Sequence, residues 1–206
     1  MSLRNILRLY VIIDKALIGK KSELETASSV ISGGATTIQL RDKYSSTRRL
    51  IKIGLGLRKL TQKNKVKFII NDRIDIALAT GADGVHLGQE DLPLGFARKL
   101  APKKLIGISI HSLTEARKAE QEGADYIALG PIFSTSSKLT GPPVGVKMIN
   151  RIKRSTRIPL VVIGGINIAN IESVITQKPD GIAIASAVLK SKSIRKSTLK
   201  IAKLLY

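Results

Sequence analysis

Acidic side chains follow two neighbouring apolar runs in a chain that is otherwise strongly basic. Asp72 comes just after the run FII (68–70), and Asp91 lies a few residues after GVHL (84–87). Carboxylates are scarce here, because 35 Lys and Arg face only 15 Asp and Glu. Asp72 alone could serve as the N-cap of the helical pattern DRIDIALAT. Together, two carboxylates at the ends of adjacent strands can hold a hard cation such as Mg²⁺.

A second polar set alternates along a segment that reads as extended. Gln39, Arg41 and Lys43 occupy every other position, so their side chains project to the same side. Two cations and an amide suit the recognition of a diphosphate. A diphosphate would also explain Asp72 and Asp91, as ligands of an Mg²⁺ ion bound against it.

Three further stretches have the composition of phosphate sites. GPIFSTSSKLTGPP (130–143) concentrates hydroxyl groups and one lysine ahead of a loop rich in Gly and Pro. In IGGIN (163–167), two glycines stand directly before a predicted helix. In IASAV (184–188), Ser186 stands directly before another predicted helix. A plain surface loop and tight turns are the alternatives for these stretches.

The chain contains only two histidines, and neither belongs to a known catalytic pattern. His86 lies within an apolar run, which favours a core position or a supporting role over acid–base catalysis. His111 ends another run and is equally ambiguous. No Ser–His–Asp arrangement, HExxH or Walker motif is present.

The elements that must position these residues are short β-branched runs separated by helical patterns. The spacing predicts buried parallel strands at 9–13, 35–40, 67–70, 84–87, 105–110, 126–130, 159–164 and 181–186. Between two of them, Ser112 is a predicted N-cap with Glu115 three residues later, and Gly123 closes that helix.

Eight strand–helix units predict a single (β/α)₈ TIM barrel spanning residues 1–206. A doubly wound open sheet is less suitable, because no GxGxxG motif follows the first strand. In such a barrel the C-terminal strand ends form one rim, where function resides. Asn71, Ser109 and the polar sets above all fall at such ends.

Composition bounds the class and compartment of the protein. The net charge of +20 raises nucleic-acid binding as an alternative, but aromatic residues make up only 3% and Trp is absent. The basic residues fall in predicted outer helices, so we expect no nucleic-acid partner. The apolar run near the N-terminus is too short for a signal peptide or membrane span. Without cysteine, the chain fits a reducing compartment, and we expect a cytoplasmic protein without a membrane partner.

Seven stretches together resemble the thiamine phosphate synthase family, also called thiamine-phosphate pyrophosphorylase. They follow the family's order from residue 9 to about residue 188 and read LYVIID, GATTIQLRDK, INDRIDIALATGADGVHLGQEDLP, IGISIHS, GADYIALGPIFSTSSK, IPLVVIGGIN and DGIAIASAV. The most specific are QLRDK, ADGVHLGQEDLP and the GPIF-x-T-x-S-K pattern.

The resemblance implies a (β/α)₈ barrel that condenses 4-amino-2-methyl-5-(diphosphooxymethyl)pyrimidine with 4-methyl-5-(2-phosphooxyethyl)thiazole and releases diphosphate. It implies Mg²⁺ as cofactor, held by Asp72 and Asp91, and it allows a homodimer. The residues that it assigns to the pyrimidine diphosphate are Gln39, Leu40, Arg41, Asp42, Lys43, Asn71, Ser109 and Lys138. Those that it assigns to the thiazole phosphate are Thr135, Ser136, Ser137, Gly165, Ala185 and Ser186. Arg41, Lys43 and Lys138 would neutralise the leaving diphosphate, and no protein nucleophile is required.

Departures from the family pattern are few. Ser134 and Ser137 stand where the family commonly has Pro and Thr, and the turn QKPDG (177–181) replaces a GADG-like turn, so the start of the last strand could shift. Two rivals remain: a thiazole tautomerase of the same fold, and a basic nucleic-acid-binding barrel without catalysis. The tautomerase handles no diphosphate and would not need Arg41 and Lys43 together with the two aspartates.

Overall fold

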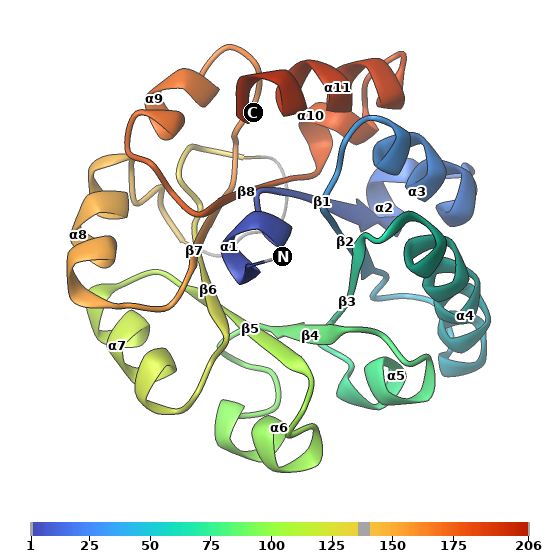
Figure 1. The fold of residues 1–206 in the computed structure, drawn as a ribbon, viewed down its shortest axis with the longest axis horizontal. Helices are drawn as coiled ribbons and strands as arrows, with labels where there is room; N and C mark the ends of the chain where they lie inside the picture. Colours follow the sequence, from blue (N-terminus) through green and yellow to red (C-terminus); the bar gives the residue numbers. More distant parts are fainter. Residues whose placement is uncertain (1, 136–140, 206) are drawn as a thin grey trace.

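Eight short strands run parallel to one another and close into a barrel in which β8 pairs with β1 (Figure 1). The computed structural model describes residues 2–135 and 141–205. The strands are β1 (Leu9–Asp14), β2 (Thr37–Arg41), β3 (Lys67–Asn71), β4 (Gly84–Leu87), β5 (Leu105–Ile110), β6 (Tyr126–Leu129), β7 (Leu160–Ile163) and β8 (Gly181–Ile184). The predicted fold and all eight predicted strands are thus confirmed, with their ends moved by at most two residues.

Helices surround the barrel as an outer ring, except α1, which covers one end of the barrel (Figure 1). Within the described part of the chain they are α1 (Leu3–Ile6), α2 (Lys15–Ile18), α3 (Glu23–Ser32), α4 (Thr47–Asn64), α5 (Ile74–Ala79), α6 (Leu94–Leu100), α7 (Leu113–Gln121), α8 (Lys147–Ser155), α9 (Ile171–Ile175), α10 (Ser186–Leu189) and α11 (Ile194–Leu205). Ser112 caps α7 as predicted, since its hydroxyl accepts the Glu115 N–H. Among the described helices, none is long and apolar enough to cross a membrane.

The apolar residues divide into two layers. The larger cluster fills the space between the strands and the helices, as expected for strands whose outward side chains meet a helical ring. The smaller cluster lies inside the barrel and includes Ile6, Leu7 and Tyr10. Because Ile6 and Leu7 belong to α1 and its C-cap, this helix forms an apolar floor at one end of the barrel. Chemistry is therefore left to the opposite rim.

The floor end of the barrel carries a repeated hydrogen-bond clamp, which we call the strand clamp. In each clamp, the residue just before a strand forms two hydrogen bonds with one residue of the preceding strand. Its N–H donates to the carbonyl of that partner, and its side-chain oxygen accepts the N–H of the partner. The pairs are Asp83 with Phe68, Asp125 with Ile106, Asp180 with Leu160 and Thr36 with Leu9. Strand clamps therefore join β3 to β4, β5 to β6, β7 to β8 and β1 to β2.

The unusual turn before β8 preserves this clamp. Two residues before the clamping residue, Gly34, Gly81 and Gly123 all have positive φ, and Lys178 adopts the same region at 52°. The Asp180 N–H donates to the Leu160 carbonyl at 2.9 Å, and the Leu160 N–H donates to the Asp180 Oδ2 at 2.9 Å. The strand β8 begins at Gly181. The sequence departure at QKPDG thus changes the side chain in the turn without displacing the strand.

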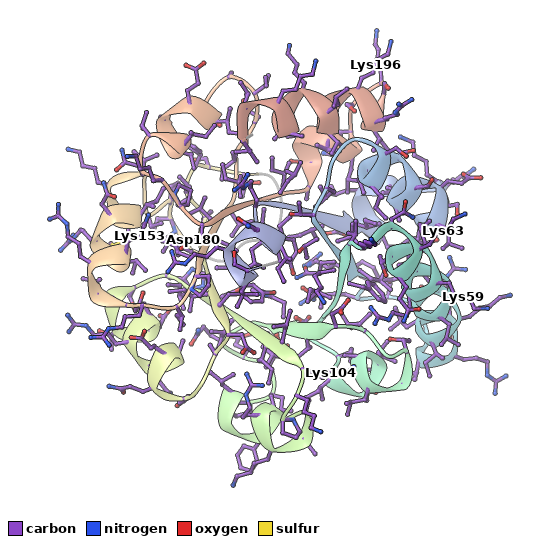
Figure 2. The ribbon with its side chains drawn as sticks, viewed as in Figure 1. Lys59, Lys63, Lys104, Lys153, Asp180 and Lys196 are labelled. Atoms are coloured by element: carbon purple, nitrogen blue, oxygen red, sulfur yellow. The ribbon has the colours of Figure 1, made fainter. Side chains whose placement is uncertain are left out.

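Many of the cationic side chains extend into solvent from the outer helices. Lys59 and Lys63 project outward from α4, and Lys196 does so from α11 (Figure 2). Others are tied to the barrel: Arg58 and Arg98 form ion pairs with the clamp residues Asp83 and Asp125 at 2.6 Å. Some of the cationic residues therefore form ion pairs that join elements of the fold, and others lie on solvent-exposed helix faces.

Candidate active site

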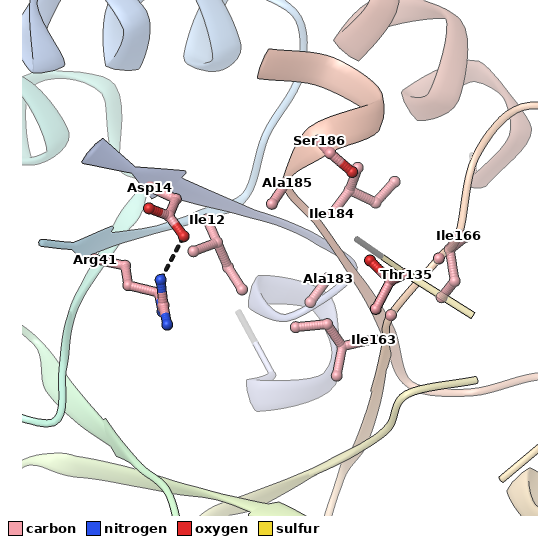
Figure 3. A pocket seen from close by; sticks show the side chains of 12 residues that line it. Ile12, Asp14, Arg41, Thr135, Ile163, Ile166, Ala183, Ile184, Ala185 and Ser186 are labelled. Carbon is pink, nitrogen blue, oxygen red and sulfur yellow. Dashed lines mark hydrogen bonds and ion pairs between the residues drawn. The ribbon is translucent and has the colours of Figure 1, made fainter. Parts of the chain in front are cut away.

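The polar rim predicted from the strand ends lies at the C-terminal end of the barrel and contains a pocket. Its lining combines apolar residues of β1, β7 and β8 with Asp14, Arg41, Thr135, Gly165, Ala185 and Ser186. Figure 3 shows Asp14 and Arg41 on one side of this hollow and Thr135 on the other. The rim thus joins residues from three separate parts of the predicted site.

Asp14 is a rim residue that sequence reasoning missed. Its Oδ2 lies 2.5 Å from the Arg41 Nη1, and its Oδ1 accepts the Ala16 N–H at the start of α2. The ion pair holds the guanidinium over the pocket, next to the end of β2. The signal was available, because Asp14 ends the run LYVIID just as Asp72 follows FII.

Asp72 adopts a backbone conformation that aims its side chain into the rim. Its φ is +60°, a left-handed value that Asp tolerates better than most residues, and its N–H donates to the His86 carbonyl at 2.8 Å. Its carboxylate lies 3.1 Å from the Lys43 Nζ. The N-cap position of α5 is Arg73, so the alternative reading of Asp72 as the capping residue is not supported. The geometry serves the site instead.

Asp72 and Asp91 come together as predicted. Burial, followed by the contact with the Asp91 carboxyl, raises the pKa of Asp72, even though Lys43 opposes this. Asp91 is held by the Gly88 N–H, which donates to its Oδ2 at 2.6 Å. The two carboxyl groups lie in contact, and the Lys43 ammonium neutralises only the Asp72 side of the pair. A divalent cation would stabilise both carboxylates.

The donor set fits Mg²⁺ in particular. Among the described residues, no group of three or more His, Asp or Glu side chains could enclose a metal ion. Mg²⁺ commonly uses one or two carboxylates and takes its remaining ligands from water and substrate phosphates. Asp72 and Asp91 would supply that protein share.

Gln39 faces the barrel interior and begins a buried polar chain. Its Nε2 donates to the Tyr10 Oη at 2.8 Å, and the Tyr10 and Tyr126 hydroxyls lie 3.1 Å apart. The Tyr126 Oη lies 3.1 Å from the His86 Nδ1, and the His86 Nε2 lies 3.0 Å from the Ser109 Oγ. Two predicted ligands, Gln39 and Ser109, are thus connected through three residues that the sequence reading left unassigned or placed in the core.

His86 occupies the supporting position that was predicted for it. Burial lowers its pKa to about 4, against a smaller opposing effect of the Asp91 charge. The ring is therefore neutral at physiological pH and stacks on Tyr126, with ring centroids 5.6 Å apart. His111 at the end of β5 instead bonds the Gly130 carbonyl through Nδ1 at 2.5 Å.

The other residues predicted for the pyrimidine diphosphate differ in what their side chains can reach. Leu40 is buried in the layer between strands and helices, so only its backbone can face a ligand. The Asp42 Oδ1 accepts the N–H groups of Tyr44 and Ser45 at 3.0 Å and thereby closes the turn that leads to α4. Asn71 ends β3 beside His86 on β4, at the rim.

The predicted phosphate end of the site contains two βα connections of different form. Ser186 begins α10 directly after β8, as predicted. The expectation that a helix follows Gly165 at once is wrong, because α9 starts only at Ile171. The intervening loop is closed by Asn170, whose Nδ2 donates to the Gly165 carbonyl at 2.9 Å. Gly165 has φ +66°, and a Cβ there would lie 2.6 Å from the Ser134 carbonyl oxygen.

The close approach of Gly165 to Ser134 brings the loop after β7 into contact with the loop after β6. The Phe133 N–H donates to the Gly164 carbonyl at 3.1 Å, which places Thr135 at the edge of the pocket with Gly165. The predicted ligands Ser136, Ser137 and Lys138 lie outside the described residues.

Comparison with known proteins identifies the family to which the chain belongs. The sequence model of a family described as "Thiamine monophosphate synthase" matches residues 9–188. A thiamine-phosphate synthase of Pyrococcus furiosus is 44% identical over 204 residues, covering 99% of this chain and 97% of that protein. One of Moorella thermoacetica is 47% identical over 183 residues, covering 88% and 87%. A solved thiamine phosphate pyrophosphorylase from Pyrococcus furiosus superposes with a TM-score of 0.92 at 43% identity, covering 99% of this chain and 98% of that one.

Proposed function

The chain belongs to the thiamine monophosphate synthase family, and from this membership we propose how its rim performs the family reaction. The enzyme is a transferase that joins the pyrimidine diphosphate to the thiazole phosphate, giving thiamine phosphate and diphosphate. The observation that carries the proposal is the pairing of two cations with three carboxylates at one rim: Arg41 with Asp14, and Lys43 with Asp72 beside Asp91.

The pyrimidine diphosphate binds with its ring toward the barrel interior and its diphosphate toward the cations. Gln39 and Ser109 bond to interior side chains, whereas Arg41 and Lys43 lie farther along β2 and the loop that follows it. Asp72 and Asp91 would hold an Mg²⁺ ion, which would supply positive charge to help neutralise the diphosphate. The Lys43 ammonium, which is paired with the Asp72 carboxylate at 3.1 Å, lies where it can bind the diphosphate.

The reaction needs charge stabilisation and positioning, and no protein nucleophile. The C–O bond to the diphosphate breaks first, and its electron pair leaves with the diphosphate. The pyrimidine methylene cation is stabilised by the ring amine until the thiazole nitrogen donates its lone pair to form the C–N bond. Arg41, Lys43 and Lys138 stabilise the negative charge that grows on the leaving group.

The thiazole phosphate binds across the pocket from Arg41. Gly165, Ala185 and Ser186 lie on the connections after β7 and β8, with Thr135 beside them. Phosphate groups commonly bind at these two connections in barrels of this fold, where backbone N–H groups are available. Ser136 and Ser137, which follow Thr135 in the sequence, are assigned to the same phosphate by the family resemblance alone.

A coupled assay with both substrates tests the metal proposal. Asp91→Asn should raise the Mg²⁺ concentration needed for half-maximal rate, and it should lower kcat/KM at limiting Mg²⁺ roughly 100-fold, about 3 kcal/mol. Asp72→Asn should act in the same direction. Glu90→Gln is the matched control, since it removes a neighbouring carboxylate that the proposal gives no role. Unchanged Mg²⁺ dependence in both aspartate variants would refute the proposed cation site.

The rival activity of a thiazole tautomerase is not favoured. Its proton transfer involves no diphosphate, whereas the rim holds Arg41, Lys43, Asp72 and Asp91 together.

We also propose a cellular location and an oligomeric state for the enzyme. A cytoplasmic location is supported by the absence of cysteine, which suits a reducing compartment. A homodimer follows from the family resemblance, and sedimentation of the purified protein tests it.

A further inference from the structure

A chain of five side chains crosses the barrel interior beneath the proposed pyrimidine site. It runs from Gln39 on β2 through Tyr10 on β1, Tyr126 on β6 and His86 on β4 to Ser109 on β5. The two hydroxyls and the imidazole are almost completely removed from solvent, with exposed fractions of 2% for Tyr10, 0% for Tyr126 and 8% for His86. Buried polar groups of this kind must place every proton on a partner.

The direction of the hydrogen bonds follows from counting protons. The Gln39 Nε2 is only a donor, so the Tyr10 oxygen accepts from it. The single Tyr10 proton then goes to Tyr126, and the single Tyr126 proton goes to the His86 Nδ1. That nitrogen is thus an acceptor, and the neutral ring carries its proton on Nε2, where it donates to the Ser109 Oγ.

Other assignments leave a proton without a partner in this chain. If the Tyr126 hydroxyl donated to Tyr10 instead, the Tyr10 oxygen would accept twice, and its own proton would have no acceptor among these five residues. If the His86 ring carried protons on both nitrogens, Nδ1 would donate to Tyr126, and the Tyr126 proton would be the unplaced one. A buried donor without an acceptor loses its hydrogen bond to water and gains none in return, which disfavours both assignments.

We propose that Tyr10, Tyr126 and His86 are positioning residues that fix the His86 ring as the Nε2–H tautomer and so keep the Ser109 proton available to the substrate. Because Ser109 Oγ accepts from His86, its own O–H is left to donate into the site. The Gln39 amide sets the direction of the whole chain, which couples its orientation to that of Ser109. This inference rests on the proposed role of Gln39 and Ser109 in binding the pyrimidine.

The tautomer can be measured without any substrate. The full chain contains only His86 and His111, so ¹⁵N-histidine labelling gives two ring systems, which a His111→Asn sample assigns. At neutral pH we expect the His86 Nδ1 to resonate as an unprotonated nitrogen and Nε2 as a protonated one. A protonated Nδ1 would show that the chain runs the other way and that the Ser109 proton is consumed by the ring, which would overturn the proposal.

Two matched variants separate positioning from packing, since each removes one hydroxyl from the same buried pair. Tyr10→Phe leaves the Tyr126 proton with His86 as its acceptor, so the Nε2–H tautomer should persist. Tyr126→Phe removes the donor to Nδ1, so the ring should become a mixture of tautomers. Unchanged ring signals in Tyr126→Phe would contradict the proposal.

Kinetics then connect the tautomer to the reaction. Tyr126→Phe should raise the KM for the pyrimidine diphosphate about 3–10-fold, the effect of one weakened hydrogen bond, and should leave the KM for the thiazole phosphate in place. Equal changes in both KM values would point to a general loss of packing and count against a positioning role. If the tautomer behaves as expected but neither KM moves, the coupling to Ser109 is refuted, whereas synthase activity itself remains measurable in the unmodified protein.

Discussion

Single residues at the rim are held by backbone geometry as much as by side-chain pairing. Asp72 uses a left-handed φ of +60° to face Lys43 and Asp91, and Gly165 uses φ +66° to let two loops touch. Such conformations are paid for by the surrounding structure, and they often mark functional positions. The proposed cation and phosphate sites therefore depend on the two connections that hold these residues.

The neutral His86 should make the stability of the protein depend on pH. Its pKa is lowered from 6.5 to about 4, so below pH 6.5 the unfolded chain binds a proton that the folded ring refuses. Stability is then fully present above pH 6.5 and is lost as the pH falls toward 4, by about 3 kcal/mol from this residue. Urea unfolding of the wild type and His86→Asn, measured across this range without Mg²⁺, should give a steeper pH slope for the wild type. Parallel slopes would contradict this account.

Two residues of the stretch after β6 should affect different kinetic constants. Lys138→Ala should mainly lower kcat, because the charge that it neutralises on the leaving diphosphate grows in the transition state. Ser137→Ala should mainly raise the KM for the thiazole phosphate, whose charge is unchanged by the reaction. Steady-state kinetics with each substrate varied in turn separates the two. A Lys138→Ala enzyme with normal kcat and a raised thiazole KM would reverse the assignment.

At the scale of elements, strand order and strand ends follow closely from the sequence. Near-continuous apolar runs such as LYVII and LIGISI are typical of buried strands in a helix-covered sheet, and β1 and β5 lie where these runs predict. Residues just past such runs are therefore on the rim, which is why Asp72, Asp91 and Asn71 could be found. Asp14 obeyed the same rule and was overlooked.

Other features were not predictable because they depend on contacts between distant strands. Tyr10 and Tyr126 are 116 positions apart, and nothing in either local pattern indicates that their hydroxyls meet inside the barrel. The wrong prediction of a helix directly after Gly165 has a local cause. The asparagines at 167 and 170 satisfy the loop backbone through side-chain hydrogen bonds and so delay α9.

The turn before β8 offers a direct test of the strand clamps. Lys178 has φ 52°, in a position where the corresponding residues of the other three clamps are glycines. Lys178→Gly should stabilise the protein by about 0.5–1 kcal/mol, because a left-handed conformation is strained for a residue with a Cβ. Thermal unfolding should show a Tm higher by about 1–4 °C.

Gly81→Lys is the reverse control for this prediction. No atom lies within 4 Å of a Cβ built at Gly81, so the substitution adds backbone strain and no collision. It should lower the Tm by a similar amount. A lower Tm in Lys178→Gly would show that the contacts of the lysine side chain outweigh the strain of its backbone.

At the scale of the whole molecule, the charge of +20 is best explained without a nucleic-acid partner. Cations such as Lys59 and Lys63 on α4 and Lys196 on α11 project into solvent from different sides of the barrel, and aromatic residues are only 3% of the chain. Any affinity for DNA should be weak, independent of sequence and lost steeply between about 50 and 200 mM salt. Fluorescence anisotropy with unrelated duplexes checks this. Tight, sequence-selective binding at physiological salt would require another explanation of the charge.

The strand clamps also bear on where such a chain can begin. Each clamp joins the two strands of one pair, and β8 pairs with β1 in the same parallel manner as every other neighbour. The barrel is thus a ring of four clamped strand pairs, and a chain cut in the connection between two pairs leaves both strands of every pair joined in sequence. In a circularly permuted chain, a cut in the connection after β2, β4 or β6 would keep the two residues of every clamp close in sequence, whereas a cut within a pair would place the two residues of its clamp at opposite ends of the chain.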